Sequence, residues 1–231
     1  MELSVRLLGP PTIQRAGAEV IRFRSLKSWA ILTYLVICSY PPSRSHLASM
    51  LFLHAEDPLR ALRWNLTELR SGLGGHVSIE GDPIRFELSE RVDVDLDLLL
   101  RGGALEAARL PGIGLELLEG ITLEGAAAFE SWLLSPRRLV AARSGAVLHE
   151  AGLASISSGD VDEAIDFATR ALALNPLDEG HHALLIRAYR LAGDEESARR
   201  QYEVCEAVLS EKLGVGPGAV VLDAMRMPVE R

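Results

Sequence analysis

The sequence predicts a mainly α-helical fold with small antiparallel β-structure, made of a mixed first part and an all-helical second part. Three observations support this prediction. Short alternating segments precede any helix, three helix patterns and a hairpin pattern follow, and Leu, Ala and Glu dominate from Val92 onward. Since 231 residues suffice for two ordinary domains, we expect domains at residues 1–91 and 92–231.

The distribution of charge differs between the two parts. The whole chain carries a net charge of −8, with 24 Lys+Arg and 32 Asp+Glu. Residues 1–91 hold 11 Lys+Arg and 9 Asp+Glu, whereas residues 92–231 hold 13 and 23, so the two net charges are +2 and −10. The acidic total therefore does not exclude a local phosphate-binding patch in the first part.

The composition also indicates a cytoplasmic protein. No apolar run is long enough to span a bilayer, and the N-terminus lacks the pattern of a signal peptide, so no membrane partner is expected. The two cysteines, Cys38 and Cys205, lie in apolar helical contexts. They are typical of buried thiols in a reducing compartment and indicate neither a disulfide framework nor a metal site.

The first 23 residues predict a small antiparallel sheet. Leu3–Leu8 is a strand that Gly9-Pro10-Pro11 ends, and Thr12–Gln14 is a short second strand. A turn at Ala16-Gly17 then leads to an alternating third strand at Glu19–Phe23.

Two helices follow this sheet. Ser25 caps the first, which runs to about Cys38, and Ser43 caps the second, which runs to about Leu53. Their predicted inner faces consist of Trp29, Leu32, Leu35 and Val36 in the first helix, and Leu47, Met50 and Leu51 in the second.

The third helix has clear start and stop signals. Asp57 can accept the first free N–H groups, Pro58 suits the first helical position, and Gly74 suits the residue that ends a helix. A single apolar stripe is made by Leu62, Leu66, Leu69 and Leu73. Because three arginines lie on the remaining faces, this segment is either a DNA-reading helix or an ordinary solvated amphipathic helix.

A hairpin completes the first part. His76–Ile79 and Ile84–Leu88 alternate around Gly81-Asp82-Pro83, and Val77 and Ile79 are expected to face Ile84 and Phe86. The order of sheet, three helices and hairpin predicts a winged helix-turn-helix, in which the third helix enters the major groove. The hairpin would be the wing.

The second part is predicted to be all helical. The acids of Asp93-Val94-Asp95 lead into a helix, residues 102–125 are broken by glycines, and a long helix runs from about Ala126 to Ser157 with a candidate kink at Pro136. Beyond it, Gly159-Asp160 recurs as Gly193-Asp194 after 34 residues. In this repeat Ala164 matches Ala198 and Ala171 matches Cys205, and one more short helix is expected after Gly218. A helix–turn–helix period of 34 residues predicts tetratricopeptide-like packing.

With both parts in view, the chain resembles the SARP family of bacterial transcriptional activators, which join an OmpR-type winged helix to a bacterial transcriptional activation domain. The resemblance covers nearly the whole chain. It is carried by LLGPPTI, SLKSWAILTYLV, SRSHLASMLF, RWNLTELRSGLG, VDVDLDLL, FESWLLSPRRL, GDVDEAIDFATRALALNPLDEGHHALLIRAYRLAGD and EKLGVGP.

The resemblance implies an activator that binds direct repeats in double-stranded promoter DNA as a head-to-tail homodimer and contacts RNA polymerase. Two positions depart from the family pattern. Phe52 replaces the usual Trp in the same pocket, and Glu68 stands where a basic residue is more common. Glu68 repels phosphate and could accept from a cytosine amino group, which changes the expected DNA preference.

The candidate DNA contacts lie on four elements, namely the three helices and the hairpin. They are Arg60, Arg63, Trp64, Asn65, Thr67, Arg70 and Ser71 on the third helix, Lys27, Arg44 and Ser45 at helix N-termini, and Arg85 on the hairpin. Arg63, Thr67 and Arg70 are expected at base edges or phosphates, and Arg60 and Ser71 at phosphates. Trp64 would pack either on a thymine methyl or sugar or against a partner. Lys27, Arg44 and Ser45 are either phosphate contacts or solvated surface residues.

No pattern indicates an enzyme, a cofactor or a metal site. The adjacent His181 and His182 point to different sides of a helix, and no nucleophile–base pair has a recognisable context. Two alternatives to a DNA-binding regulator remain. One is a protein-interaction scaffold, favoured by the modest +2 charge of residues 1–91 and by Glu68. The other is the input half of a larger sensor.

Overall fold

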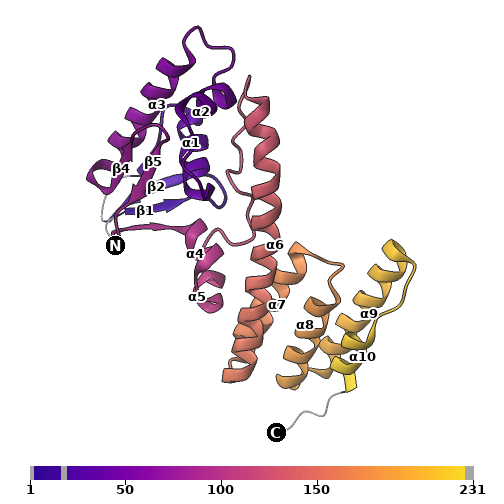
Figure 1. Cartoon of the computed structure of the whole chain (residues 1–231). Coiled ribbons are helices and arrows are strands. Elements are labelled where there is room, and N and C mark those ends of the chain that lie inside the picture. The colour runs from indigo at the N-terminus through magenta and orange to yellow at the C-terminus, as the bar shows by residue number, and fades with distance from the viewer. Residues whose placement is uncertain (1–2, 17–19, 227–231) are drawn as a thin grey trace. The chain divides into compact units, whose positions relative to one another are not determined.

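The structure is a computed structural model that describes residues 3–16 and 20–226. It confirms a mainly helical fold with small sheets, a mixed first region and an all-helical second region (Figure 1). The chain forms two compact units. The first comprises Met1–Arg101 and Leu115–Val140, and the second comprises Gly102–Gly114 and Ala141–Arg231.

The sheet of the first unit has four strands in the order β3-β2-β1-β6. β1 (Leu3–Arg6), β2 (Thr12–Arg15) and β3 (Val20–Ile21) are antiparallel neighbours, as predicted, and part of the turn expected at Ala16-Gly17 lies outside the described residues. β6 (Val92–Val94) pairs parallel with β1 and leads directly into the helix predicted there, α4 (Asp95–Arg101), so the helix is confirmed but the strand before it was not predicted. Val94 is buried and pairs with Val5, which accounts for the extra strand.

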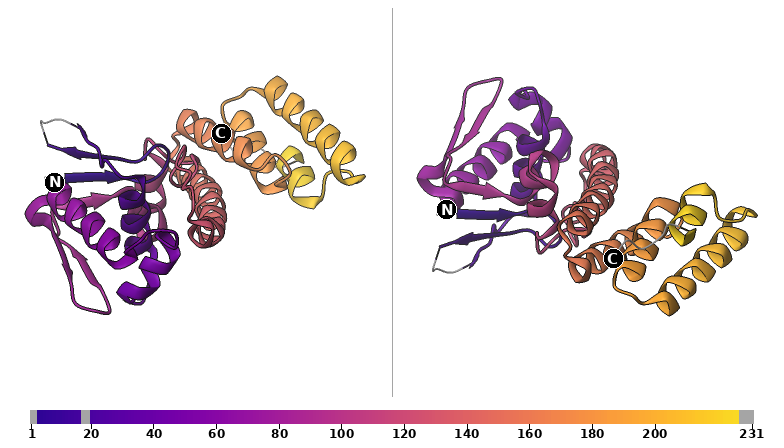
Figure 2. Two further views of the ribbon diagram at one scale, coloured as in Figure 1. Left: turned by 90° about the horizontal axis from the view of Figure 1, so that it is seen from above. Right: turned by 90° about the horizontal axis from the view of Figure 1, so that it is seen from below.

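Three helices pack together beside this sheet (Figure 2). Ser25 caps α1 (Leu26–Ile37), Ser43 caps α2 (Arg44–Leu51) and Asp57 caps α3 (Pro58–Leu73), each by accepting a backbone N–H of the first turn. The leucine stripe of α3 is confirmed, since all four side chains are 0% exposed. Gly74 ends α3 with a φ of +61°, a value that favours glycine.

The hairpin follows α3 through a single turn, η1 (Gly74–His76), and consists of β4 (Val77–Glu80) and β5 (Arg85–Leu88). Ile79 faces Phe86 as predicted, but Val77 faces Leu88. Ile84 lies before the paired segment, where it is buried and its N–H donates to the carbonyl of Pro42 over 2.8 Å.

Segments that follow the hairpin complete the first unit. Asp95, at the start of α4 (Asp95–Arg101), accepts the N–H groups of Leu7 and Leu8 at 2.9–3.0 Å. The first half of α6 (Ala127–Ser158) places the Trp132 ring 4.6 Å from the Tyr34 ring, between centroids. The domain boundary expected after residue 91 stays a prediction. The boundaries between the compact units lie after Arg101, Gly114 and Val140.

The second unit is all helical. It contains α5 (Ala104–Ala108), the second half of α6, α7 (Val161–Leu174), α8 (Glu179–Leu191), α9 (Glu195–Leu213) and α10 (Ala219–Arg226). The two repeats match in detail. Gly159 and Gly193 have φ values of +82° and +79°, and the aspartate after each glycine caps the next helix. The paired small residues Ala164, Ala171, Ala198 and Cys205 are all 0% exposed, which lets the helices approach closely.

Candidate nucleic-acid interface

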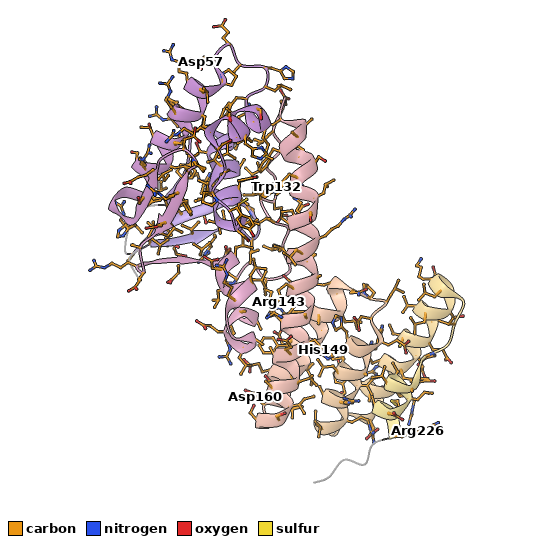
Figure 3. All side chains as sticks on the ribbon, viewed as in Figure 1. Asp57, Trp132, Arg143, His149, Asp160 and Arg226 are labelled. Carbon is orange, nitrogen blue, oxygen red and sulfur yellow. The ribbon has the colours of Figure 1, made fainter. Side chains whose placement is uncertain are left out.

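The face of α3 opposite the leucine stripe is open to solvent. Six of the predicted contact residues on α3 are exposed: Arg60, Arg63, Trp64, Thr67, Arg70 and Ser71. Figure 3 shows nitrogen-tipped side chains projecting outward along α3 below Asp57. A duplex groove can therefore be reached by arginine, hydroxyl and indole groups from one helix.

Arg63 is an exposed cation of this face with two weak contacts inside the protein. Its side chain is 67% exposed, and the guanidinium lies 4.0 Å from the Asp57 carboxylate. Its Nε also donates to the carbonyl of Leu59 over a long 3.4 Å. An exposed pair at this distance contributes little free energy, so the guanidinium can exchange it for a phosphate or a base edge. Trp64, the next residue of α3, is 51% exposed.

Asn65 is a correction to the predicted contacts. It is only 3% exposed, and both ends of its amide are bonded within the protein. Nδ2 donates to the carbonyl of Ala61 over 2.9 Å, and Oδ1 accepts from the Ser28 hydroxyl at 2.8 Å. Asn65 therefore joins α3 to α1 and does not face a duplex.

Glu68 has a structural contact instead of the expected cytosine contact. Its carboxylate accepts the backbone N–H of Arg24 at 2.7 Å and that of Ser25 at 3.4 Å. It also accepts the Ser28 hydroxyl at 2.6 Å. The carboxylate thus sits at the N-terminus of α1, where it compensates free N–H groups and the positive end of the helix dipole.

Two predicted arginines connect the hairpin to the helices. The guanidinium of Arg70 donates to the carbonyl of Ile79 in β4. Arg44 Nε donates to the carbonyl of Gly81 over 3.0 Å, while the Asp82 carboxylate accepts the Arg44 backbone N–H at 2.9 Å. The N-terminus of α2 is therefore occupied by Asp82, and the phosphate contact predicted there has a competitor already in place.

The other predicted residues differ in how free they are. Ser45 is exposed, and its hydroxyl lies 3.0 Å from that of Ser43. Arg85 is exposed on β5 and faces Glu80 across the hairpin. Lys27 is half-buried with its ammonium 4.8 Å from the centre of the Phe52 ring, and burial lowers its pKa. The Lys27 side chain thus packs on the residue that departs from the family pattern.

Sequence reasoning missed three arginines beside α3. Arg15, Arg22 and Arg24 are exposed and line a hollow of about 490 Å³ together with Trp64, Thr67 and Ser71. The hollow exists because Phe23 packs against α3 at Gly72, where an added Cβ would lie 2.6 Å from Phe23 Cε1. The sequence pattern that could have indicated these contacts is Arg22-Phe23-Arg24, in which two arginines flank an apolar residue.

Other kinds of site have less support in the described ranges. Within residues 3–16 and 20–226, no three His, Cys, Asp or Glu side chains are grouped so that they could hold a metal ion. No helix in the same ranges combines the length and apolar character needed to cross a membrane.

The fold and the exposed face of α3 define a winged helix-turn-helix protein with a tetratricopeptide-like helical region. A family model described as "Bacterial transcriptional activator domain" matches residues 85–226. Since this match covers more than half of the chain, the protein belongs to that family of bacterial transcriptional activators, which are typically not enzymes. A comparison with curated protein sequences found no match.

A solved structure has the same fold. It is that of "Mycobacterium tuberculosis EmbR in complex with low affinity phosphopeptide", with a TM-score of 0.67 and 18% sequence identity. The similarity covers 97% of this chain and 64% of that chain, so the present chain spans less than two thirds of its structural relative. At this identity the comparison supports the two-part fold and not a shared ligand.

Proposed function

We propose that this protein is a cytoplasmic, sequence-specific DNA-binding activator that inserts α3 into the major groove of promoter DNA. The observation that carries the proposal is the exposed face of α3, which leaves arginine, tryptophan and hydroxyl groups open while the opposite leucines are buried. Membership of a transcriptional activator family makes duplex DNA the expected partner of this face.

The exposed residues fall into two groups, those that would reach base edges and those that would reach phosphates. Arg63, Trp64 and Thr67 lie along the middle of α3, where side chains reach base edges in a major groove. Arg22 and Arg24 lie beside the helix and would contact the phosphate backbone. Arg85 on the wing would meet a phosphate or the minor groove.

The wider assembly follows from the family. We infer that two copies bind direct repeats head to tail as a homodimer on DNA, and that the helical second part contacts RNA polymerase. The scaffold alternative loses one of its supports, because Glu68 is engaged at the N-terminus of α1. Its carboxylate therefore does not indicate an interface that avoids DNA.

The test is a binding series with DNA from upstream of neighbouring genes, measured by fluorescence anisotropy over a range of salt concentrations. Arg63→Ala should weaken binding by roughly tenfold, and Arg22→Ala should lower the slope of log K against log salt by about one. Arg170→Ala is the matched control, since Arg170 is a partly exposed helical arginine of the second unit. Equal affinities for all three variants and the parent would refute the assignment of the reading face.

A further inference from the structure

The hollow beside α3 has the size of a small-molecule site. Its volume of about 490 Å³ lies within the range of pockets that hold small ligands. Trp64, Thr67 and Ser71 line it from one face of α3, because they are three and four residues apart. Its cationic lining consists of three exposed arginines from β2 and the segment after β3, namely Arg15, Arg22 and Arg24. The hollow therefore brings an indole, two hydroxyls and three guanidinium groups to one concave surface.

The charge of the hollow is positive. Three guanidinium groups and the one carboxylate of Glu68 give its lining a net charge of +2. The Glu68 carboxylate is already engaged, since it accepts the backbone N–H of Arg24 at 2.7 Å and the Ser28 hydroxyl at 2.6 Å. None of the three arginines forms an ion pair with a carboxylate of the described residues. Because a guanidinium binds phosphate through two parallel N–H bonds, this lining suits a ligand with several phosphate groups.

The aromatic and cationic parts of the lining extend along α3. Arg15 lies at the C-terminal end of this helix, where its Nη2 is 3.6 Å from the point that a Cβ at Gly74 would occupy. Trp64 is 51% exposed and lies ten residues before Gly74, which is about 15 Å along the helix axis. A nucleoside triphosphate is elongated in the same way, with an aromatic base at one end and phosphate groups at the other.

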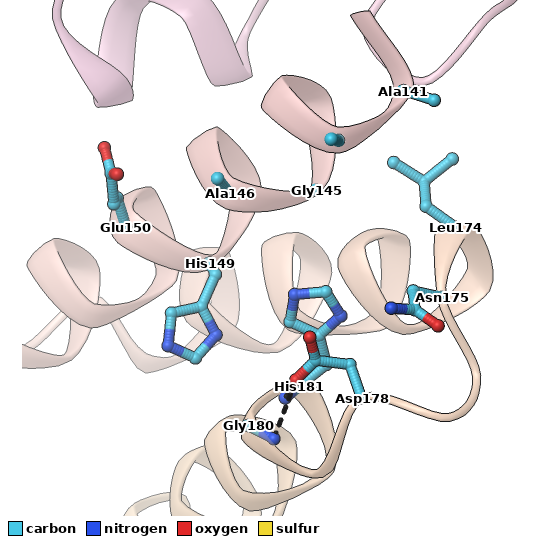
Figure 4. Close-up of a pocket in the computed structure, with 11 residues that line it drawn as sticks. Ala141, Gly145, Ala146, His149, Glu150, Leu174, Asn175, Asp178, Gly180 and His181 are labelled. Atoms are coloured by element: carbon cyan, nitrogen blue, oxygen red, sulfur yellow. Dashed lines mark hydrogen bonds between the residues drawn. The ribbon is translucent and has the colours of Figure 1, made fainter. Parts of the chain in front are cut away.

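A pocket of similar size in the second unit has a different lining (Figure 4). It has a volume of about 570 Å³ and lies between the second half of α6 and the segment that joins α7 to α8. Its charged side chains are the carboxylates of Glu150 and Asp178, and the rings of His149 and His181 lie beside them. Burial lowers the pKa of His149, so this imidazole is neutral near pH 7. A ligand rich in phosphate therefore meets cations in the hollow beside α3 and carboxylates in the second pocket.

We propose that the hollow beside α3 binds a nucleoside triphosphate, with the base on the Trp64 indole and the phosphate groups among the guanidinium groups. Every base has a π-face that can stack on an indole, so the phosphates and not the identity of the base define the ligand class. Trp64, Thr67 and Ser71 also belong to the face of α3 that is proposed to enter DNA. The bound nucleotide and a duplex therefore exclude each other. This exclusion rests on the proposed function, whereas the binding of the nucleotide does not.

The test of binding uses the full chain without DNA. ATP is the probe, adenosine supplies the base without phosphates, and inorganic triphosphate supplies the phosphates without a base. Binding is followed by calorimetry and by ¹H–¹⁵N spectra of the tryptophan indole groups. We expect ATP to shift the Trp64 signal saturably and to leave the signals of the buried Trp29 and the half-buried Trp132 in place. Adenosine and triphosphate should each bind at least tenfold more weakly, because each lacks one of the two kinds of contact.

Two variants test the two ends of the hollow by calorimetry. Arg15→Ala removes one guanidinium and Trp64→Ala removes the indole, so each should weaken ATP binding by roughly tenfold. Both side chains are exposed, so the fold should tolerate their loss. Arg138→Ala is the matched control, since Arg138 is an exposed helical arginine of the first unit outside the hollow, and it should bind ATP as the parent does. No saturable Trp64 shift, equal binding of triphosphate and ATP, or unchanged binding by Arg15→Ala or Trp64→Ala would each overturn the proposal.

A second titration tests the exclusion. ATP is added to the protein bound to a labelled promoter duplex, and release of the duplex is followed by fluorescence anisotropy. We expect release over the ATP concentrations that saturate the Trp64 signal, and ATP bound together with the duplex would overturn the exclusion. If the protein binds no duplex, the proposed function fails, while the measurements without DNA still decide whether the hollow is a nucleotide site.

Discussion

Replacing Glu68 by alanine should destabilise the first unit through the loss of three hydrogen bonds. The carboxylate accepts two backbone N–H groups at the start of α1 and the hydroxyl of Ser28. A side-chain cap contributes about 0.5–2 kcal/mol, and hydrogen bonds to a charged group about 1.5–3 kcal/mol. Because Glu68 is half-buried and one of the three bonds is long at 3.4 Å, we expect a net loss of about 2–3 kcal/mol.

Tryptophan fluorescence measures this loss selectively, since all three tryptophans, Trp29, Trp64 and Trp132, belong to the first unit. With a urea slope of roughly 2 kcal/mol per molar, the midpoint should fall by about 1 M. Glu80→Ala is the control, because Glu80 is exposed on the wing and should shift the midpoint little. An unchanged midpoint for Glu68→Ala, together with a changed preference at one base pair, would show that Glu68 reads DNA.

Three further perturbations test the fold. Burial raises the pKa of Asp95 to about 6, so ionisation of this carboxyl opposes folding and stability is lost as the pH rises from about 4 through 6. Relative to Asp95→Asn, the parent should lose about 2 kcal/mol of unfolding free energy between pH 4 and pH 7, measured by urea unfolding. A difference that stays constant with pH would contradict this. Leu66→Ala should cost about 2–5 kcal/mol by the same assay, whereas Leu59→Ala at a 48% exposed position should cost less than about 1 kcal/mol. Gly193→Ala should lower the midpoint of thermal unfolding, followed by helical circular dichroism, because a φ of +79° strains an alanine backbone. Gly103→Ala is the control, since Gly103 has a φ of −70°. Equal midpoints for the two variants would argue against backbone strain at position 193.

Features with a local period could be predicted from the sequence. The leucine stripe of α3 needs only the 3.6-residue repeat of one helix, and its four members are fully buried. The pairs Gly159-Asp160 and Gly193-Asp194 likewise specify a helix end and the next cap within a few residues. These local signals were sufficient for the order of helices and for the winged-helix prediction.

Features that depend on distant residues could not be predicted. The partners of Asn65 and Glu68 lie on α1, about forty positions earlier in the chain, and no local pattern indicates them. β6 is a short strand whose parallel partner β1 lies at the other end of the first part, so no local pattern indicated a strand before the helix that begins at Asp95. Arg22 and Arg24 are candidate DNA contacts only because Phe23, which lies between them, packs against Gly72 of α3.

The polar residues of α3 therefore form two sets with different tasks. Asn65 and Glu68 connect α3 to α1, and Arg70 connects it to β4, so the rotation of the helix about its own axis is fixed from two sides. That rotation decides which side chains face outward, and groups that read bases must be held within roughly 0.5 Å and 10–20° of their productive geometry. A residue such as Asn65 can thus influence DNA affinity without touching DNA, because its loss lets the exposed set turn away from the groove. Variants of Asn65, Glu68 or Arg70 should therefore lower both DNA affinity and the free energy of unfolding. Variants of Arg63 should lower DNA affinity alone.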